Sequence, residues 1–343
     1  MTPARFDELT KRYASLRIVV LGDFSLDRYL DIDPARNESS IETGLPVYNV
    51  TGVRAQTGAA GTILNNLVAL GVGTVLPIGF CGEDGEGWEL LHALRNLPRV
   101  NLEWFVQTTA RHTFTYTKPL IHEQGRAPRE LNRLDVKNWT PSPPEVEEKI
   151  IAALTRASRD ADAVIVLDQV DIAETGVITA AVRNALSKIS DARPALPVLA
   201  DCRRGLRGWP PCIWKMNASE LSVLEGVSSV DPPAMLAATA RLARTNDRSV
   251  FVTLAERGIL GADPSGHAAH VPAFPVRGEI DIVGAGDAVS ANLAAALAAG
   301  AGMREAMESA MAAASIVIHQ TGTTGTATME GMRRLLFPDL DCE

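Results

Sequence analysis

The sequence predicts an α/β protein in which a doubly wound, mostly parallel sheet is flanked by helices and carries a small β-sheet lid. Short apolar runs alternate with helix-like segments along the chain, a pattern typical of such sheets. Two stretches, about 28–56 and 102–121, instead alternate polar and apolar residues and predict the lid. The apolar runs have no polar face, as expected of parallel strands buried on both sides; they are Arg17–Gly22, Thr74–Gly79, Ala163–Leu167, Pro197–Asp201 and Ser249–Leu254.

The size and composition of the chain fit a single globular domain. It has 343 residues, of which 46% are hydrophobic and 22% are charged, enough for one large core. No internal repeat or low-complexity linker divides the sequence, so residues 1–343 are predicted to form one domain. The net charge of −8 and the lack of long Lys/Arg runs argue against a nucleic acid or an anionic membrane as a partner.

The cysteines and the first residues bear on the cell compartment. Four cysteines show no metal-ligand spacing, so free, reduced thiols are expected; they are Cys81, Cys202, Cys212 and Cys342. Residues 1–13 are charged and lack an apolar centre, so a signal peptide is not expected. No apolar run reaches membrane-spanning length. A cytoplasmic location is therefore expected.

A glycine turn late in the chain is the strongest local signal. Gly284 and Gly286 flank Ala285 where an Ala- and Leu-rich helix must begin, since no helix breaker follows before Gly300. The first N–H groups of a helix have no internal partner, and the helix dipole adds about half a positive charge there. The turn is therefore suited to hold an anion. Asp287 would place a carboxylate beside that anion, although Asp at a helix start is also a common N-cap.

The string Gly-Ala-Gly-Asp after an acidic residue, opening an Ala-rich helix, resembles the signature of the ribokinase-like carbohydrate kinases, the phosphofructokinase-B family. The resemblance extends over about residues 15–330. It implies a ribokinase-like fold, with ATP and Mg²⁺ as cofactors. It also implies that Asp287 is the general base and that an anion hole for the transferring phosphoryl group lies at Gly284, Ala285 and Gly286.

The loop just before this turn departs from the family pattern. Most members have Thr at one or both of the positions that Ile282 and Val283 occupy here. The resemblance makes Asp281, in the same loop, a candidate ligand for a monovalent cation such as K⁺. A Walker P-loop is absent, since no Gly-x-x-x-x-Gly-Lys-Ser/Thr string occurs. The phosphate-binding loop of the P-loop NTPases is therefore excluded.

The first predicted strand leads into candidate substrate residues. The string Gly-Asp-x-x-Leu-Asp-Arg-Tyr at residues 22–29 is similar to the start of the heptose-phosphate kinases within this family. The resemblance assigns Asp27 to a sugar hydroxyl. Strand ends in open α/β sheets face the ligand crevice, which makes Asp23 a second candidate. Either Asp can instead be a turn former.

A second glycine turn departs from its family pattern. Relatives have Gly-Gly-x-x-Asn, in which the glycines and the Asn touch the sugar. This chain keeps Gly58 as a substrate-binding candidate, but it has Thr57 for the first Gly and Gly61 for the Asn. An altered substrate is the simplest interpretation, and lost activity is the alternative.

Two further residues are candidates on the substrate side. Arg133, in an Arg-Leu-Asp string that again resembles the heptose kinases, suits a substrate oxyanion because a guanidinium binds phosphate through two hydrogen bonds. An ion pair with Asp135 is the alternative. Asp168 ends a core strand where relatives carry acidic or polar residues near the sugar. Asp84, before a predicted helix, is assigned to helix capping.

Later motifs predict the nucleotide side. The string from Asn217 to Glu220 resembles the family's Asn-x-x-Glu. These two residues share one face of a helix start and would hold Mg²⁺, mostly through water. The same spacing fits a capping box, and both can be true. Thr253 and Gly258 match the family's nucleotide loop, and Ser315 is a candidate on a helix that would flank the adenine.

These assignments predict ATP- and Mg²⁺-dependent phosphorylation of a hydroxyl on a sugar or sugar phosphate. The lid is expected to close on the sugar and exclude water; in the resembling family it often forms a dimer contact, so a homodimer through the lid is predicted. Two alternatives stay open: a kinase for a nucleoside or other small alcohol, and a sugar- or nucleotide-binding regulator that no longer catalyses. The first strand does not end in G-x-G-x-x-G, which argues against a nicotinamide dehydrogenase.

Overall fold

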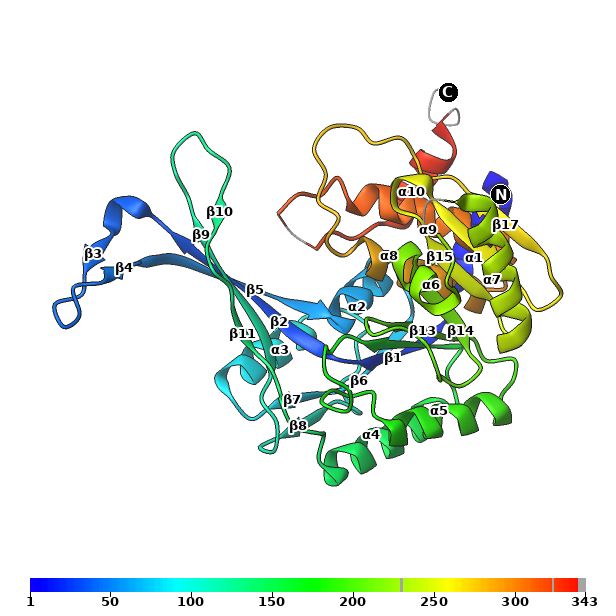
Figure 1. Cartoon of the computed structure of the whole chain (residues 1–343), viewed down its shortest axis with the longest axis horizontal. Helices are drawn as coiled ribbons and strands as arrows, with labels where there is room; N and C mark the ends of the chain where they lie inside the picture. The colour runs from blue at the N-terminus through cyan, green and yellow to red at the C-terminus, as the bar shows by residue number, and fades with distance from the viewer. Residues whose placement is uncertain (229–230, 323, 339–343) are drawn as a thin grey trace.

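An eight-stranded sheet lies at the centre of the computed structural model, which describes residues 1–228, 231–322 and 324–338 (Figure 1). The strands are β1 (Arg17–Gly22), β6 (Thr74–Ile78), β12 (Ala163–Asp168), β13 (Val198–Cys202), β14 (Ile213–Asn217), β15 (Val250–Thr253), β16 (Ile259–Ala262) and β17 (Ala268–Val271). Their order is β17-β16-β15-β14-β13-β12-β1-β6. From β15 to β6 all neighbours are parallel, whereas β16 and β17 add antiparallel at one edge.

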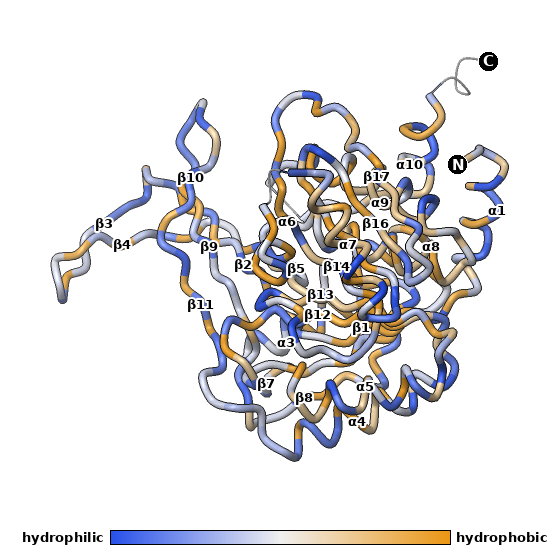
Figure 2. Tube along the Cα trace, turned by 45° about the vertical axis from the view of Figure 1, so that its right-hand side comes forward, coloured by the Kyte–Doolittle hydropathy of each residue, from blue (hydrophilic) through white to orange (hydrophobic). Residues whose placement is uncertain are grey.

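Helices cover both faces of this sheet. Alternate residues of β1 pack into two separate cores, because Ile18 and Val20 point to one face and Val19 and Leu21 to the other. This explains why the strands read as apolar runs without a polar face, and Figure 2 shows those runs as apolar segments inside the molecule. The prediction of a doubly wound, mostly parallel sheet is confirmed.

The helices divide between the two cores. The first core takes α1 (Pro3–Tyr13), α2 (Ala60–Ala69), α3 (Gly85–Arg95), α8 (Ala285–Ala298), α9 (Met303–Val317) and α10 (Met329–Leu336). The second core takes α4 (Pro144–Ala157), α5 (Ala180–Ala192), α6 (Ala218–Glu225) and α7 (Pro232–Asn246). Among the described residues, none of these helices is long and apolar enough to cross a bilayer.

The cysteines are consistent with a reduced protein. Cys81, Cys202 and Cys212 are buried and free, which confirms the expectation for these three. Burial raises the pKa of each thiol to about 12, so the reactive thiolate is disfavoured. Cys342 lies outside the described residues.

A second sheet projects from the body beside β1 (Figure 1). This lid sheet has the order β10-β9-β2-β5, with β11 also paired to β9. Its strands are β2 (Phe24–Ile32), β5 (Val50–Ala59), β9 (Phe114–Ile121), β10 (Arg129–Glu130) and β11 (Leu134–Val136). A hairpin of β3 (Glu38–Ser39) and β4 (Pro46–Val47) extends from its outer end.

The lid sheet differs from the expected stretches in one respect. The segment from Leu102 to Gln107 does not belong to it, because β8 (Val106–Thr108) pairs in parallel with β7 (Phe80–Gly82) in a separate two-stranded sheet. The apolar side chains of Leu102 and Phe105 pack against the first core instead. The alternating pattern there reflects partial burial against the body.

The two faces of the lid sheet differ in chemistry. Asp27 pairs in register with Gln56 and with Tyr116, so these three side chains share one face. This inner face is turned towards the start of α8, where the charge of Asp27 acts on Asp287. The opposite, outer face exposes Val53 and Leu134, whose exposed fractions are 54% and 64%.

Asp84 connects α3 to the base of the lid sheet. Its carboxylate caps α3 by accepting from Gly87 N–H (2.7 Å), and it also accepts from the backbone N–H (3.0 Å) and the hydroxyl (2.6 Å) of Thr113, next to β9. The predicted capping role is confirmed. Burial alone would raise the pKa of Asp84, but the hydrogen bonds from Thr113 and Gly87 hold it below its usual value.

The substitution Asp84→Ala is expected to lower the free energy of unfolding by about 2 kcal/mol, because it removes an N-cap and two charge-assisted hydrogen bonds. Since the pKa is lower in the folded state, this contribution is present above the unfolded pKa and is lost as the pH falls through the folded pKa. Urea unfolding at pH 7 and pH 3 measures both effects. Glu83→Ala, at the exposed neighbouring residue, is the control; equal losses for both variants would contradict the assignment.

Candidate active site

The start of α8 leaves backbone donors unused. Gly284 is its N-cap, with a φ of 82° that favours glycine. The N–H of Ala285 donates back to Ile282 O (3.2 Å). In the described part of the chain, no acceptor meets the N–H of Gly286 or of Asp287. Of the three residues predicted to form the anion hole, Ala285 has its amide engaged, whereas the amides of Gly284 and Gly286 meet no acceptor among the described residues. The anion hole itself stays a prediction.

Asp287 stands in the first turn of α8 but does not cap it. The cap position belongs to Gly284, and the half-buried carboxylate makes no hydrogen bond or ion pair among the described residues. Burial raises the pKa of Asp287 to about 7; Lys215 lowers it, but Asp201 and Asp27 add to the rise. The N-cap interpretation is wrong, and a carboxylate near neutrality suits a general base.

A buried ion pair lies directly beneath this turn. Lys215 Nζ, on β14, is 2.6 Å from Asp201 Oδ2, on β13. The hydroxyl of Ser290, one turn into α8, donates to the same oxygen (3.3 Å). A Cβ added to Gly286 would lie only 3.2 Å from Lys215 Nζ. The Lys215 amine therefore lies close to the first turn of α8.

Sequence reasoning assigned no role to Lys215 or to Asp201 at this site. A signal was present: Lys215 lies between Trp214 and Met216 in an otherwise apolar strand, and a lysine is fully buried only when it is paired. Burial alone would lower the pKa of Lys215, but the ion pair with Asp201 outweighs it and raises the pKa above its usual value.

The lid contributes the residues that face Asp287. Asp27 is 7% exposed, and its carboxylate lies 3.3 Å from Lys118 Nζ on β9. A Cβ on Gly58 would lie 2.4 Å from Asp27 Oδ1, so any side chain at this position would displace the Asp27 carboxylate. The structure thus brings together Asp27, Gly58 and Asp287 as predicted candidates and adds Lys118, whose period-2 spacing from Tyr116 was the available signal.

The two unusual residues of the second glycine turn compensate for each other. A Cβ on Gly61 would lie 2.5 Å from the Cβ of Thr57. The Thr57 side chain therefore fills the space that any side chain at position 61 would enter. Thr57 is 2% exposed. Its hydroxyl accepts a hydrogen bond from Asn65 Nδ2 (3.0 Å). The two departures from the family pattern are therefore coupled: a side chain is gained at position 57 and lost at position 61, and both changes concern the same space.

Asp23 and Asp168 form a buried group behind the crevice. The two oxygens of Asp23 accept from Gln169 N–H (2.8 Å) and Val177 N–H (2.7 Å), and burial together with the charge of Asp168 raises its pKa to about 7. Asp168 is fully buried and paired with Arg204. Both oxygens of Asp23 are thus engaged by backbone N–H groups, which differs from the expectation of a substrate ligand. Asp168 keeps one oxygen, Oδ1, buried without a hydrogen-bond partner among the described residues, so its role as a substrate ligand stays a prediction.

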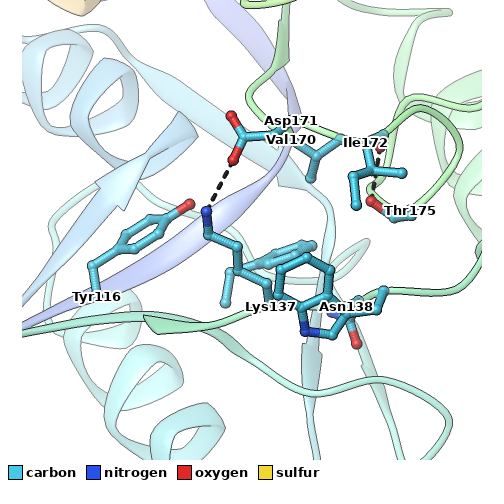
Figure 3. A pocket seen from close by; sticks show the side chains of 9 residues that line it. Tyr116, Lys137, Asn138, Val170, Asp171, Ile172 and Thr175 are labelled. Carbon is cyan, nitrogen blue, oxygen red and sulfur yellow. Dashed lines mark hydrogen bonds and ion pairs between the residues drawn. The ribbon is translucent and has the colours of Figure 1, made fainter. Parts of the chain in front are cut away.

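Arg133 directly precedes β11, and its guanidinium lies over the ring of Tyr116, which lines a small pocket at the base of the lid. Its guanidinium makes two hydrogen bonds to Asp135 (2.8 and 2.7 Å), so the ion-pair alternative is observed. Figure 3 shows Lys137 between Tyr116 and Asp171, with Lys137 Nζ 2.9 Å from the Asp171 carboxylate. The pocket adjoins the inner face of the lid, since Tyr116 is in register with Asp27.

A larger pocket, with a volume of about 560 Å³, opens beside the start of α8. It is lined by four of the predicted nucleotide residues: Asn217, Thr253, Gly258 and Ser315. Gly258 has a φ of 98°, and a Cβ there would meet Val271 O at 2.1 Å. The pocket continues to Gly286, so a ligand in it would reach the free amides of α8.

The candidate metal ligands already hold each other. Asn217 Oδ1 accepts from Glu220 N–H (2.9 Å) and Glu220 Oε2 from Asn217 N–H (2.8 Å), a complete capping box. Glu220 keeps its second carboxylate oxygen, and Asn217 keeps the second lone pair of Oδ1, to accept hydrogen bonds from a metal-bound water. In the described ranges no cluster of three His, Cys, Asp or Glu side chains could hold a metal. An ion here would depend on phosphate and water for most of its ligands.

The loop before α8 fits a monovalent cation poorly through its side chains. Asp281 Oδ1 accepts from Val283 N–H (3.0 Å), and Ile282 and Val283 are 73% and 51% exposed. No hydroxyl replaces the Thr of relatives at these two positions.

The chain matches known proteins along most of its length. Residues 16–329 match a family model described as pfkB family carbohydrate kinase. The bifunctional protein HldE of Bradyrhizobium sp. (strain ORS 278) is 29% identical over 337 residues, covering 96% of this chain and 66% of that protein. HldE of Hyphomonas neptunium is 32% identical over 329 residues, covering 95% and 64%. The chain thus spans slightly less than two thirds of the length of these relatives.

Solved structures share the fold. The ribokinase of Arabidopsis thaliana, complexed with ribose and ATP, superposes with a TM-score of 0.68 at 19% identity, over 94% of this chain and 98% of that chain. The phosphofructokinase-2 of Escherichia coli, in complex with fructose-6-phosphate, gives 0.68 at 17% identity, over 94% and 97%. These similarities confirm the predicted ribokinase-like fold.

The coupled exchange at Thr57 and Gly61 predicts non-additive stability. Gly61→Ala alone should lower the free energy of unfolding by about 1–3 kcal/mol through overpacking against Thr57. In a Thr57→Gly background the same change should be neutral or stabilising, because the clash is gone and Ala favours a helix. Gly85→Ala, in the first turn of α3 with open space around it, is the control. Additive effects in this urea-unfolding cycle would contradict the coupling.

Proposed function

Because the chain belongs to the pfkB family of carbohydrate kinases and is thus an ATP-dependent sugar kinase, we propose that Asp287 is the base that takes the proton of the acceptor hydroxyl. One observation carries this proposal. The Asp287 carboxylate has no hydrogen-bond partner in the described chain, lies beside unused amides and faces Asp27 of the lid. A pKa of about 7 lets it accept a proton near neutral pH.

The transfer follows from these positions. The acceptor oxygen forms a bond to the γ-phosphorus, the bond from that phosphorus to the bridging oxygen breaks with its electron pair leaving on ADP, and the hydroxyl proton passes to Asp287. The amides of Gly286 and Asp287 would donate to the phosphoryl oxygens where charge develops. Asp27 would orient the acceptor by accepting hydrogen bonds from its hydroxyls, and Gly58 leaves room for that carboxylate.

The acceptor that we propose is a sugar phosphate of the heptose-phosphate type. The string at residues 22–29 supports this class, as does the naming of relatives as HldE. Lys118 adds a cation on the inner face beside Asp27, where it would favour an anionic sugar over a neutral one. Arg133 would join only after exchanging its bonds to Asp135 for bonds to a phosphate.

The cofactor assignments are proposals of the same kind. Mg²⁺, held by Asn217 and Glu220 through water, would compensate the phosphate charge when ATP is bound. Thr253, Gly258 and Ser315 would contact the nucleotide in the large pocket. A K⁺ ion in the loop before α8 would have Asp281 as its carboxylate and would depend on backbone oxygens for its other ligands, because Ile282 and Val283 offer no hydroxyl. Faster turnover in KCl than in tetramethylammonium chloride is expected if the ion binds.

The lid sheet is proposed to close on the sugar and to pair two copies of the chain. Val53 and Leu134 expose apolar side chains on its outer face, and paired outer faces would remove them from water. The inner face would then remain free to cover the acceptor.

The test is ADP release from ATP and Mg²⁺ with a panel of hexoses, heptose phosphates, pentoses and nucleosides. Turnover is expected with a sugar or sugar phosphate. Asp287→Asn should lower kcat by about 10²–10⁴-fold, the usual contribution of a general base. Its melting temperature should stay close to that of the wild type. Asp160→Asn, at an exposed Asp after α4, should change nothing.

Other outcomes of this assay separate the alternatives. Turnover on nucleosides alone would replace the sugar assignment with a nucleoside kinase. Nucleotide binding without turnover on any acceptor would favour a binding protein. Full activity in Asp287→Asn would show that the base has been assigned to the wrong residue.

A further inference from the structure

The ion pair of Lys215 and Asp201 is placed at a site where stability alone does not require it. Lys215 is 6% exposed, and its ammonium is held by Asp201 (2.6 Å). Removing two charges from water costs several kcal/mol, and such pairs are often no more stable than apolar side chains of the same size. Both neighbours of Lys215 along β14, Trp214 and Met216, are apolar and buried. A fixed charge at this one position needs another explanation.

Lys215 points at the first turn of α8. Its Nζ is 3.2 Å from the place of a Cβ on Gly286, so glycine there leaves the amine an open path to the amides. An ammonium has three donors, and Asp201 engages one of them. The remaining donors lie beside the unused N–H groups of Gly286 and Asp287.

The surroundings of the amine hold it in place. Asp201 fixes Lys215 and is itself held by the hydroxyl of Ser290 (3.3 Å). Asp287 and Glu220 add negative charge nearby and keep the amine protonated. The cation is therefore preorganised, which is the condition under which a charge stabilises a transition state without reorganisation cost.

We propose that Lys215 is a catalytic residue whose ammonium contacts the transferring phosphoryl group from below, between the amides of α8 and the sheet. This inference rests on the proposed function. As the bond to the bridging oxygen breaks and the acceptor oxygen bonds to phosphorus, negative charge is spread over the phosphoryl oxygens. Lys215 donates to one of these oxygens while the proton goes to Asp287. The γ-phosphoryl group is present in ATP and absent from ADP, so Lys215 must distinguish the two nucleotides.

The test compares the binding of a non-hydrolysable ATP analogue with that of ADP, both with Mg²⁺, by calorimetry. In Lys215→Met the analogue should bind about tenfold more weakly or worse, as expected for loss of one charge-assisted hydrogen bond. ADP should bind within about twofold of the wild type, because it lacks the contacted group. With the best acceptor, kcat should fall by about 10² or more. Lys149→Met, at an exposed lysine of α4, should leave both affinities unchanged.

A second variant guards against unfolding. Lys215→Met leaves Asp201 buried and unpaired, so Lys215→Met combined with Asp201→Asn removes both charges and keeps the fold testable by its melting temperature. Loss of discrimination between the analogue and ADP in the folded double variant supports the proposal. Equal weakening of both nucleotides, or none, overturns it even if kcat falls. A wild-type protein that binds neither nucleotide contradicts the proposed function itself.

Discussion

The candidate active site is organised around one electrostatic arrangement, the buried ion pair of Lys215 and Asp201 beneath the first turn of α8. The carboxyl ends of parallel strands collect polar groups at one edge of a sheet, and β13 and β14 place this pair there. Burial of Asp287 above it shifts the pKa of that carboxyl to about 7. A cation, unused amides and a titratable carboxylate thus lie together at the carboxyl end of the sheet.

The lid completes this arrangement because its inner face is polar and its outer face is apolar. Register places Asp27 opposite Gln56 and Tyr116, so a one-residue slip would turn the acidic group away from α8. Gly58 allows Asp27 to pack closely against β5. The exchange of bulk between Thr57 and Gly61 keeps the same backbone with a different side chain in the turn. This favours an altered acceptor contact over a damaged site.

Local patterns predicted much of this protein. Apolar runs located the core strands, because strands buried on both faces have no polar side. The Gly-Ala-Gly-Asp string located the start of α8 within two residues, since glycine conformations and helix ends are local properties. The segment from Leu102 to Gln107 was misplaced because its alternation reflects packing on the body, which only the tertiary contacts reveal.

The parts that the sequence did not predict depend on contacts that only the folded chain shows. Asp23 is occupied by the N–H groups of Gln169 and Val177, about 150 residues further along the chain. The coupling of Thr57 to Gly61 depends on an atomic distance that no pattern encodes. Lys215 was visible as a charge in an apolar strand, but its place under α8 follows only from the sheet order.

The pH dependence of kcat/KM, compared between wild type and Asp287→Asn, tests the central claim most directly. The base must be ionised to act, so the account predicts that wild-type kcat/KM falls about tenfold per pH unit below an apparent pKa near 7, the value to which burial raises Asp287. The residual activity of Asp287→Asn should lack this acidic limb. A wild-type profile that stays flat down to pH 5, or a limb near pH 7 that survives in the variant, would contradict the account.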